Sequence, residues 1–331
     1  MYKSKNFYCL PPEWQLQLAS ELNGEFINDK IIRLPKSLGK GHSYFIQVIP
    51  GIAVLLMDFT LTKPLEIHRV KDDTQRFIFH FDVSDKPNLI NVSGKDFKVG
   101  YSINLGLSVL DNQATSSFKP TMKSRTFALR LFIDKKLMND FIENNPIPEF
   151  ENQQITISKK SLLYYNYIDS NSIVLLLSLK EKSILDESFE AQIKGISLKL
   201  LGNFLNRHSN PVVAKEEMNT TEDEALIKTK NHLLDNLYNQ FPSITHLSEI
   251  AGMSASRFKA LFKKRFMDTP KNIFIREKML LANTLLQSGD FNTLTEVIHE
   301  LDYTKLDYFS SKYFNFFNKK PSEDFIKRRD T

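Results

Sequence analysis

The sequence predicts an α+β chain that has a β-rich N-terminal region, a helical stretch after it and an all-α C-terminal region. Three observations lead to this prediction. Short apolar segments separated by turn residues follow one another from residue 31 to residue 134. An apolar stripe with helical spacing then runs through residues 184–205. Finally, an aromatic pattern in the last third of the chain occurs twice with one fixed offset.

Composition restricts the class of protein. The chain has 331 residues, of which 41% are hydrophobic and 25% charged, as in folded proteins of one to three domains. Cys9 is the only cysteine, which excludes an intrachain disulfide and a cysteine-based metal site. We see no signal peptide at the start, and the longest apolar run, 173–177, is too short to span a membrane. A cytoplasmic protein is expected.

The β-rich region consists of closely spaced strands without helices between them, which favours a β-sandwich or small barrel. Pro50-Gly51, residues 85–88 and Ser93-Gly94 are turn signals between strands. The expected strands are 43–49, 52–61, 65–70, 75–83, 89–92, 101–107 and 126–133.

Helices are expected at 135–143, where residues 145–148 end the helix, and within 155–207. The clearest helix, 184–205, carries a stripe that either packs on the barrel or pairs with its copy in a dimer; its members are Phe189, Ile193, Ile196, Leu200 and Phe204. Residues 208–221 have few large apolar side chains and are interpreted as a linker. The expected domains are therefore 1–207 and 222–331.

A helix-turn-helix pattern occupies residues 247–270. Gly252 suits a tight turn, and Ser254 is a favourable N-cap for the helix that follows. That helix has an apolar stripe at Phe258, Leu261, Phe262 and Phe266, and basic residues on its other faces. Between residues 254 and 279 there are eight bases and two acids, a concentration of positive charge that suits a phosphate backbone.

A second copy of the pattern lies downstream. Phe258, Phe262, Phe266 and Pro270 recur 51 positions later as Phe309, Tyr313, Phe317 and Pro321. The turn pair Gly252-Met253 recurs 50 positions later as Asp302-Tyr303, so the second turn is one residue longer. The C-terminal region is thus predicted to hold two helix-turn-helix units, with further helices at 222–240, 271–287 and 321–329.

Residues 225–329 resemble the DNA-binding domain of the AraC/XylS transcription regulators. The resemblance rests on AGMSASRF, LFKKRF and TP in the first unit, on KMLLANTLL, which is similar to the family's linker helix, and on Tyr308-Phe309, Tyr313 and Pro321 in the second. It implies a sequence-specific transcription regulator that binds double-stranded DNA and is more often an activator than a repressor. The sequence departs from the family at Met267, Asp302 and Lys278, where the family usually has Gly, Gly and Arg.

The same resemblance assigns site residues. Base-facing positions lie early and midway along the second helix of each unit, at Ser256, Lys259 and Ala260 and at Leu306, Asp307, Ser310 and Ser311. Candidates for phosphate contact are Arg257, Lys263, Lys264 and Lys305. The second unit has few bases, so we expect it to read sequence weakly or mainly to position the protein.

The β-rich region is similar to the cupin-like domain of the same family, which binds an effector and forms dimers. This implies a small-molecule effector, a homodimer and RNA polymerase as a candidate partner. Inward-facing aromatics such as Phe45, Phe77, Phe79 and Tyr101 line a pocket or, as we favour, fill the core.

No enzyme, cofactor or metal site is predicted in this region. His42, His68 and His80 form no H-x-H pair, and only Glu66 and His68 share a strand face. Two alternatives remain open. One is a ligand sensor that acts by protein–protein contact and has a degenerate second DNA-reading unit. The other is a cupin enzyme with an appended DNA-binding domain, which would require bound metal.

Overall fold

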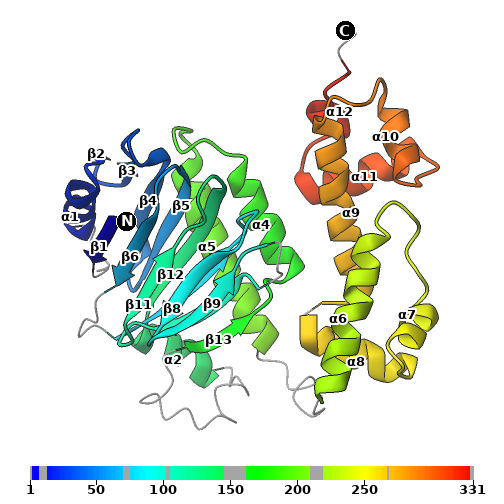
Figure 1. The fold of residues 1–331 in the computed structure, drawn as a ribbon, viewed down its shortest axis with the longest axis horizontal. Coiled ribbons are helices and arrows are strands. Elements are labelled where there is room, and N and C mark those ends of the chain that lie inside the picture. The colour runs from blue at the N-terminus through cyan, green and yellow to red at the C-terminus, as the bar shows by residue number, and fades with distance from the viewer. Residues whose placement is uncertain are drawn as a thin grey trace. The chain divides into compact units, whose positions relative to one another are not determined.

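The computed structural model describes residues 2–6, 13–69, 75–101, 105–144, 162–208, 219–266 and 268–328. The chain divides into two compact units, Met1–Ala214 and Lys215–Thr331 (Figure 1). Several positions named above lie outside the described residues, among them Cys9, Met267, 145–148 and most of 208–221.

Two sheets form the framework of the first unit. The larger sheet is antiparallel with strand order β13-β10-β7-β12-β5-β4-β3-β2, and the smaller has the order β1-β6-β11-β8-β9, in which only β1 and β6 are parallel. The strands are β1 (Tyr2–Asn6), β2 (Glu25–Ile27), β3 (Ile31–Arg33), β4 (Gly39–Ile49), β5 (Ile52–Leu61), β6 (Leu65–Arg69), β7 (Arg76–Asp82), β8 (Asn88–Val92), β9 (Lys95–Val99), β10 (Leu107–Asp111), β11 (Ser116–Lys119), β12 (Arg125–Asp134) and β13 (Leu162–Asn166).

The β4–β5 hairpin lies near the middle of the larger sheet. Its turn is at Pro50-Gly51, as predicted, and Gly51 has φ +83°, a conformation that favours glycine. All but two residues of β5 are buried, because the strand has a neighbour on each side and is covered on both faces. Its sequence is accordingly apolar almost throughout rather than alternating.

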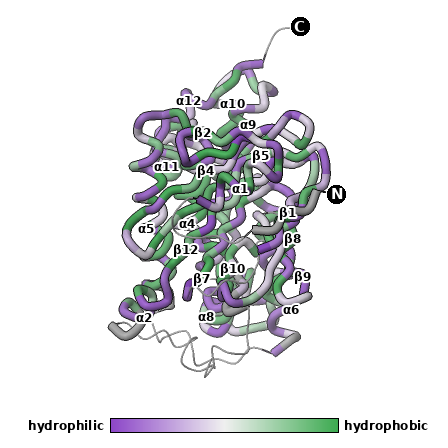
Figure 2. The backbone as a smooth tube through the Cα atoms, turned by 90° about the vertical axis from the view of Figure 1, so that its left-hand side faces the viewer, coloured by the Kyte–Doolittle hydropathy of each residue, from purple (hydrophilic) through white to green (hydrophobic). Residues whose placement is uncertain are grey.

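Two hydrophobic cores lie on opposite faces of the larger sheet. One lies between the two sheets, where α1 (Glu13–Leu22) contributes Trp14, packed edge-on against Phe45 at 5.1 Å. The other lies under α4 (Ser170–Lys180) and α5 (Phe189–His208). A further helix, α2 (Lys135–Asn144), follows β12 directly. Figure 2 shows the concentration of hydrophobic residues along the central strands.

The stripe on α5 packs on the sheet. Phe189 and Phe204 meet the rings of Tyr44 and Phe79 at 5.1 and 4.8 Å, and Ile193 and Leu200 are fully buried between them. Of the two alternatives, this stripe therefore serves core packing, and the aromatic residues expected to fill the core do so at Phe45, Phe77 and Phe79.

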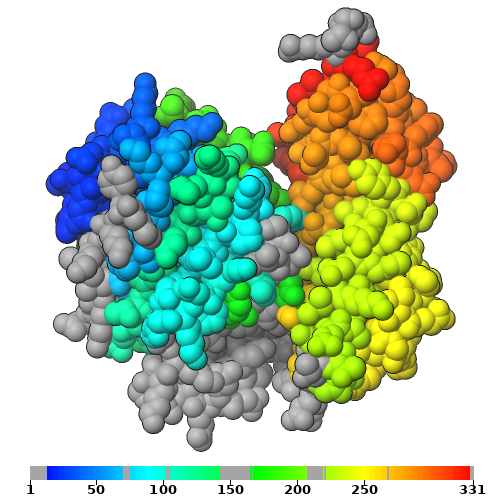
Figure 3. Space-filling model, in the orientation of Figure 1, coloured from blue at the N-terminus to red at the C-terminus, as the bar shows by residue number. Residues whose placement is uncertain are grey.

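The second unit, coloured from yellow-green to red in Figure 3, is built from helices. Side-chain caps begin α6, α7, α9 and α10 at Asn219, Ser243, Thr269 and Thr293. The helices are α6 (Thr220–Asp235), α7 (Ile244–Ile250), α8 (Ala255–Phe266), α9 (Pro270–Gln287), α10 (Leu294–Glu300), α11 (Leu306–Phe317) and α12 (Pro321–Asp324). None of the helices within the described ranges could cross a membrane.

The architecture confirms the predicted fold class, but several local predictions were wrong. Residues 162–166, expected to be helical, form β13 at the edge of the larger sheet beside β10. That pairing is set by a distant strand, which helical periodicity cannot reveal. The strand expected at 101–107 lies instead at 107–111. Helix α1 and strands β9 and β11 were not predicted.

Candidate nucleic-acid interface

The first helix-turn-helix unit consists of α7, a tight turn and α8. Gly252 in the turn has φ +64°, a left-handed conformation that costs other residues about 1–2 kcal/mol. Its amide donates to the Glu249 carbonyl at 3.0 Å, and the Met253 amide donates to the Ser248 carbonyl at the same distance. The Ser254 hydroxyl accepts from the Arg257 amide at 3.3 Å, which confirms it as the N-cap of α8.

The apolar side of α8 is fixed by aromatic packing. Phe258, Leu261, Phe262 and Phe266 are each at most 2% exposed. The rings of Phe258 and Phe262 lie 5.3 Å apart, and those of Phe262 and Phe266 lie 4.5 Å apart. Because these side chains are buried against the rest of the second unit, α8 cannot rotate about its axis. The side chains on its other side therefore remain exposed.

The opposite side of α8 exposes most of the predicted site. Ser256, Lys259, Ala260 and Lys263 are exposed, and Lys264 is half-buried. The helix carries five bases and no acid. This arrangement can neutralise phosphates on both sides of a major groove while small side chains face the bases.

Arg257, a predicted phosphate contact, is held by an acid of α6. Its Nε donates to Glu222 Oε1 at 2.6 Å, and this contact lowers the pKa of the Glu222 carboxyl. Glu222 also accepts from the Asn219 amide at 3.1 Å and so completes the capping box of α6. The neighbouring Asp223 binds Arg265 in the same way. Two adjacent acids of α6 therefore each bind an arginine of α8.

The second unit repeats this geometry with α10 and α11. Asp302 in its turn has φ +56°, so it adopts the left-handed conformation that Gly252 adopts in the first turn. Phe309 and Tyr313 are fully buried, as their repeat positions predict. The Tyr313 hydroxyl donates to Asp324 Oδ2 at 2.8 Å, which ties α11 to α12.

The predicted site residues of the second unit lie at the start and middle of α11. Lys305 occupies the N-cap position without a side-chain capping bond and is exposed. Leu306, Asp307 and Ser311 are exposed, whereas Ser310 is half-buried. The structure therefore places the two predicted sets on two separate helices, and all of these residues except the half-buried Lys264 and Ser310 are exposed.

Helix α9 joins the two units, and Lys278 on it connects their loops. Lys278 is 3% exposed, and its Nζ donates to the Asn239 carbonyl at 2.5 Å, in the loop before α7. The same Nζ lies 5.1 Å from the centre of the Tyr303 ring, in the second turn. Burial lowers the pKa of Lys278 to about 8. Gln240 adds a hydrogen bond from the same loop to the Asp302 carbonyl.

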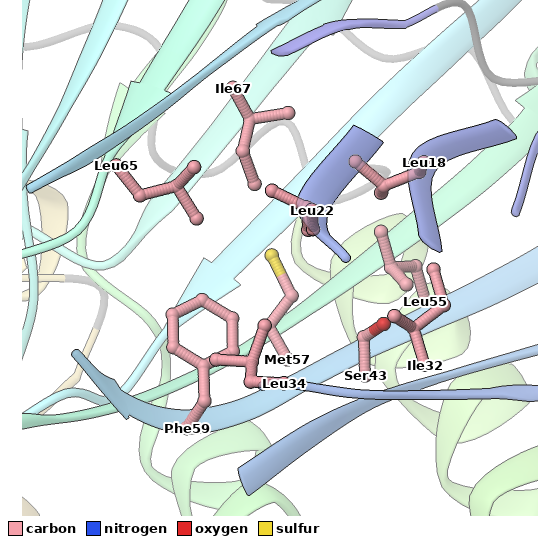
Figure 4. Close-up of a pocket in the computed structure, with 10 residues that line it drawn as sticks. All are labelled: Leu18, Leu22, Ile32, Leu34, Ser43, Leu55, Met57, Phe59, Leu65 and Ile67. Carbon is pink, nitrogen blue, oxygen red and sulfur yellow. The ribbon is translucent and has the colours of Figure 1, made fainter. Parts of the chain in front are cut away.

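In the first unit, an apolar cleft opens between the two sheets and α1 (Figure 4). Its closed space is only about 20 Å³, room for about one water molecule. Ser43 is the one polar residue among those that line it, which are Leu18, Leu22, Ile32, Leu34, Ser43, Leu55, Met57, Phe59, Leu65 and Ile67. The predicted aromatic candidates are not among them.

Where the structure describes the first unit, its histidines are not gathered with other metal-ligating side chains. His80 is fully buried; Arg130 Nε donates to its Nδ1 at 3.0 Å, and its Nε2 lies 3.4 Å from Asp82 Oδ2. Burial lowers the pKa of His80, and both ring nitrogens have a polar partner. Within the described ranges, no three metal-ligating side chains come together.

The two repeated units on the page define the class of the C-terminal part of this protein: it is a helix-turn-helix domain. A family model described as a helix-turn-helix domain matches residues 247–325. This match confirms the family resemblance drawn from the sequence.

Solved structures similar to the chain include two of ToxT from Vibrio cholerae. ToxT of strain O395 is 11% identical, with 83% of this chain and 97% of that chain covered and a TM-score of 0.27. The unsaturated fatty acid-bound ToxT of strain SCE256 is also 11% identical, with 84% and 98% covered and a TM-score of 0.27. The cupin domain of Schizosaccharomyces pombe Cnp3 is 14% identical, with 30% and 69% covered and a TM-score of 0.24. No curated protein matches the chain.

Sequence reasoning missed the residues that position the interface. Glu222 and Asp223 stand 35 and 42 residues before their arginines, so no local pattern pairs them. The Asn219–Glu222 spacing did carry a signal, because an N-cap residue followed by Glu at the third helical position is a capping box. Lys278 was noticeable in the sequence because it departs from the family pattern. Its contact with the Asn239 carbonyl could not be predicted, since Asn239 lies 39 residues earlier in the chain.

Proposed function

We propose that the protein regulates transcription by sequence-specific binding to double-stranded DNA, as an activator more often than a repressor. The observation that carries this proposal is α8: a basic exposed side without acids, held by a buried aromatic side in an AraC-type unit. The match to a helix-turn-helix domain supports the DNA-binding role. A regulator without enzymatic activity is the simplest protein that has this role. The domain limits 1–207 and 222–331 belong to the same proposal.

The proposed contacts divide by chemistry. Lys259 donates to guanine or phosphate, while Ser256 and Ala260 are small enough to let the helix approach the base edges. Lys263, Lys264, Arg257 and Lys305 contact phosphates. On α11, Ser310 and Ser311 face the bases beside Leu306 and Asp307. The exposure of these residues, apart from the half-buried Lys264 and Ser310, supports these assignments.

The first unit is proposed to bind an effector and to form a homodimer in the cytoplasm. Its cleft is apolar, so the effector would be apolar or amphipathic. The closed space is too small for such a molecule, and binding therefore requires the walls of the cleft to move apart. This movement is a change that an effector could couple to DNA binding. RNA polymerase is the proposed partner for activation.

A second candidate function is a sensor that acts by protein–protein contact. The low charge of α11 favours it, since that helix has one base and one acid against five bases on α8. Under this alternative, the second unit would not contact DNA.

Selection of duplexes from a randomised library by the purified full-length protein tests the proposal. We expect a two-box motif whose affinity falls steeply with salt. Lys259→Ala should weaken binding to the selected duplex more than Ser310→Ala does, measured by fluorescence anisotropy. The reverse order would contradict the assigned roles, and failure to retain any duplex would contradict the proposed function.

A further inference from the structure

The two recognition helices share a register but differ in chemistry. Both α8 and α11 have 12 residues, and each position of α11 lies 51 residues after its counterpart on α8. The five bases of α8 correspond in this register to five uncharged residues. In order, Arg257, Lys259, Lys263, Lys264 and Arg265 correspond to Tyr308, Ser310, Phe314, Asn315 and Phe316.

Three of the exposed side chains of α11 are apolar, whereas three of the exposed side chains of α8 are basic. Leu306, Tyr308 and Phe314 are 39%, 56% and 46% exposed, and none of them belongs to the core beneath the helix. The one base of α11, Lys312, has its Nζ 5.4 Å from the centre of the Tyr308 ring. Asp307, in the first turn, repels phosphates. The helix thus retains the backbone geometry of a DNA-reading helix but offers little to the phosphate backbone.

Apolar side chains at the start of a recognition helix have one partner in the major groove, the C5-methyl group of thymine. Leu306 is the first residue of α11, where side chains reach base edges. We propose that α11 reads a thymine-containing box through contact of Leu306 with thymine methyl groups, while α8 supplies most of the phosphate contacts. This inference rests on the proposed DNA-binding function.

Deoxyuridine substitution tests the inference, since it removes the methyl group and leaves base pairing unchanged. The probe is the duplex selected from the randomised library, resynthesised with deoxyuridine for thymine in either the α8 box or the α11 box. Each contacted methyl lost from the α11 box should weaken binding by about fourfold. Leu306→Ala should weaken binding to the thymine duplex and abolish the difference between the thymine and deoxyuridine duplexes. Alanine is a favourable helix residue, so this variant should fold.

A matched pair of variants tests the division of charge. Lys263→Ala should reduce the slope of log affinity against log salt by about 0.9, and Phe314→Ala at the same register of α11 should leave it unchanged. A duplex that binds with equal affinity after deoxyuridine substitution of the α11 box would overturn the inference and leave the exposed apolar residues of α11 for a protein partner. Failure to bind any duplex would overturn the proposed function as well, so the two failures are distinguishable.

Discussion

Replacing Glu222 by glutamine should increase the affinity of the protein for DNA. In the structure, Glu222 holds the guanidinium of Arg257, which is a proposed phosphate contact, at 2.6 Å. The Glu222 carboxylate and a DNA phosphate therefore compete for the Arg257 guanidinium. Glutamine retains the hydrogen bond to the Asn219 amide, because Glu and Gln both complete a capping box. It removes the negative charge that competes with DNA.

The size of the effect follows from counterion release. One additional phosphate contact makes the slope of log affinity against log salt steeper by about 0.9, which amounts to about eightfold in affinity between 1 M and 0.1 M salt. Glu222→Gln should therefore bind the selected duplex up to about eightfold more tightly at about 0.1 M salt. The stability of the second unit should change little, since partly exposed ion pairs contribute little to folding.

Anisotropy titrations of the full-length protein at several salt concentrations measure the affinity for DNA and the slope of log affinity against log salt. Asp223→Asn is the matched control: it releases Arg265, which lies 5.7 Å from the Phe266 ring and is not a proposed DNA contact, so the slope should not change. An unchanged slope in Glu222→Gln would refute the reasoning. So would an increase in affinity that persists when Arg257→Ala is added.

Three further predictions concern stability and geometry. Gly252→Ala should lower the free energy of unfolding by about 1 kcal/mol in urea titrations, because φ is +64° although no atom lies within 4 Å of the added Cβ; no loss would mean that the turn relaxes. Lys278→Met removes the donor to the Asn239 carbonyl. In anisotropy titrations it should weaken binding to a two-box duplex and leave binding to a duplex with only the α8 box unchanged. Equal losses on both duplexes would contradict this. Lys194 and Lys30 lower the pKa of Glu190 to about 2 from its usual 4.5, so its contribution to stability is present above about pH 4.5 and lost as the pH falls towards 2. Glu190→Gln should flatten that part of the profile of urea midpoint against pH, and an unaltered profile would exclude the ion pair as its cause.

Much of the second unit could be predicted because its pattern is local. The spacing of Phe258, Phe262 and Phe266 predicts which side of α8 is buried, and the fixed offset to Phe309 and Tyr313 extends that prediction to α11. The departure at Asp302 shows what a pattern does not reveal. The residue type differs from glycine, yet the backbone adopts the same left-handed conformation, which aspartate tolerates better than most residues.

The first unit was less predictable because its elements are defined by distant partners. Strand β13 is a strand because β10 offers a free edge more than 50 residues earlier in the chain. Burial on both faces removes the alternation by which a strand is recognised, as in β5. The same applies to the ion pairs at Glu222 and Asp223, where each side chain is ordinary by itself and acquires a role only through its partner.

The joining helix α9 has a consequence for how target sites must be phased. It runs for 18 residues, about 27 Å, and Lys278 and Gln240 link the second turn to the loop before α7. Each base pair inserted between the boxes turns the second box by about 34–36° around the duplex axis. Five inserted pairs place it on the far side of the DNA, out of reach of α11 while α8 stays bound. Ten restore the angle but shift the box by about 34 Å along the axis. A promoter recognised by both helices would therefore keep one separation, and a single-pair insertion would disable it as effectively as a change in either box.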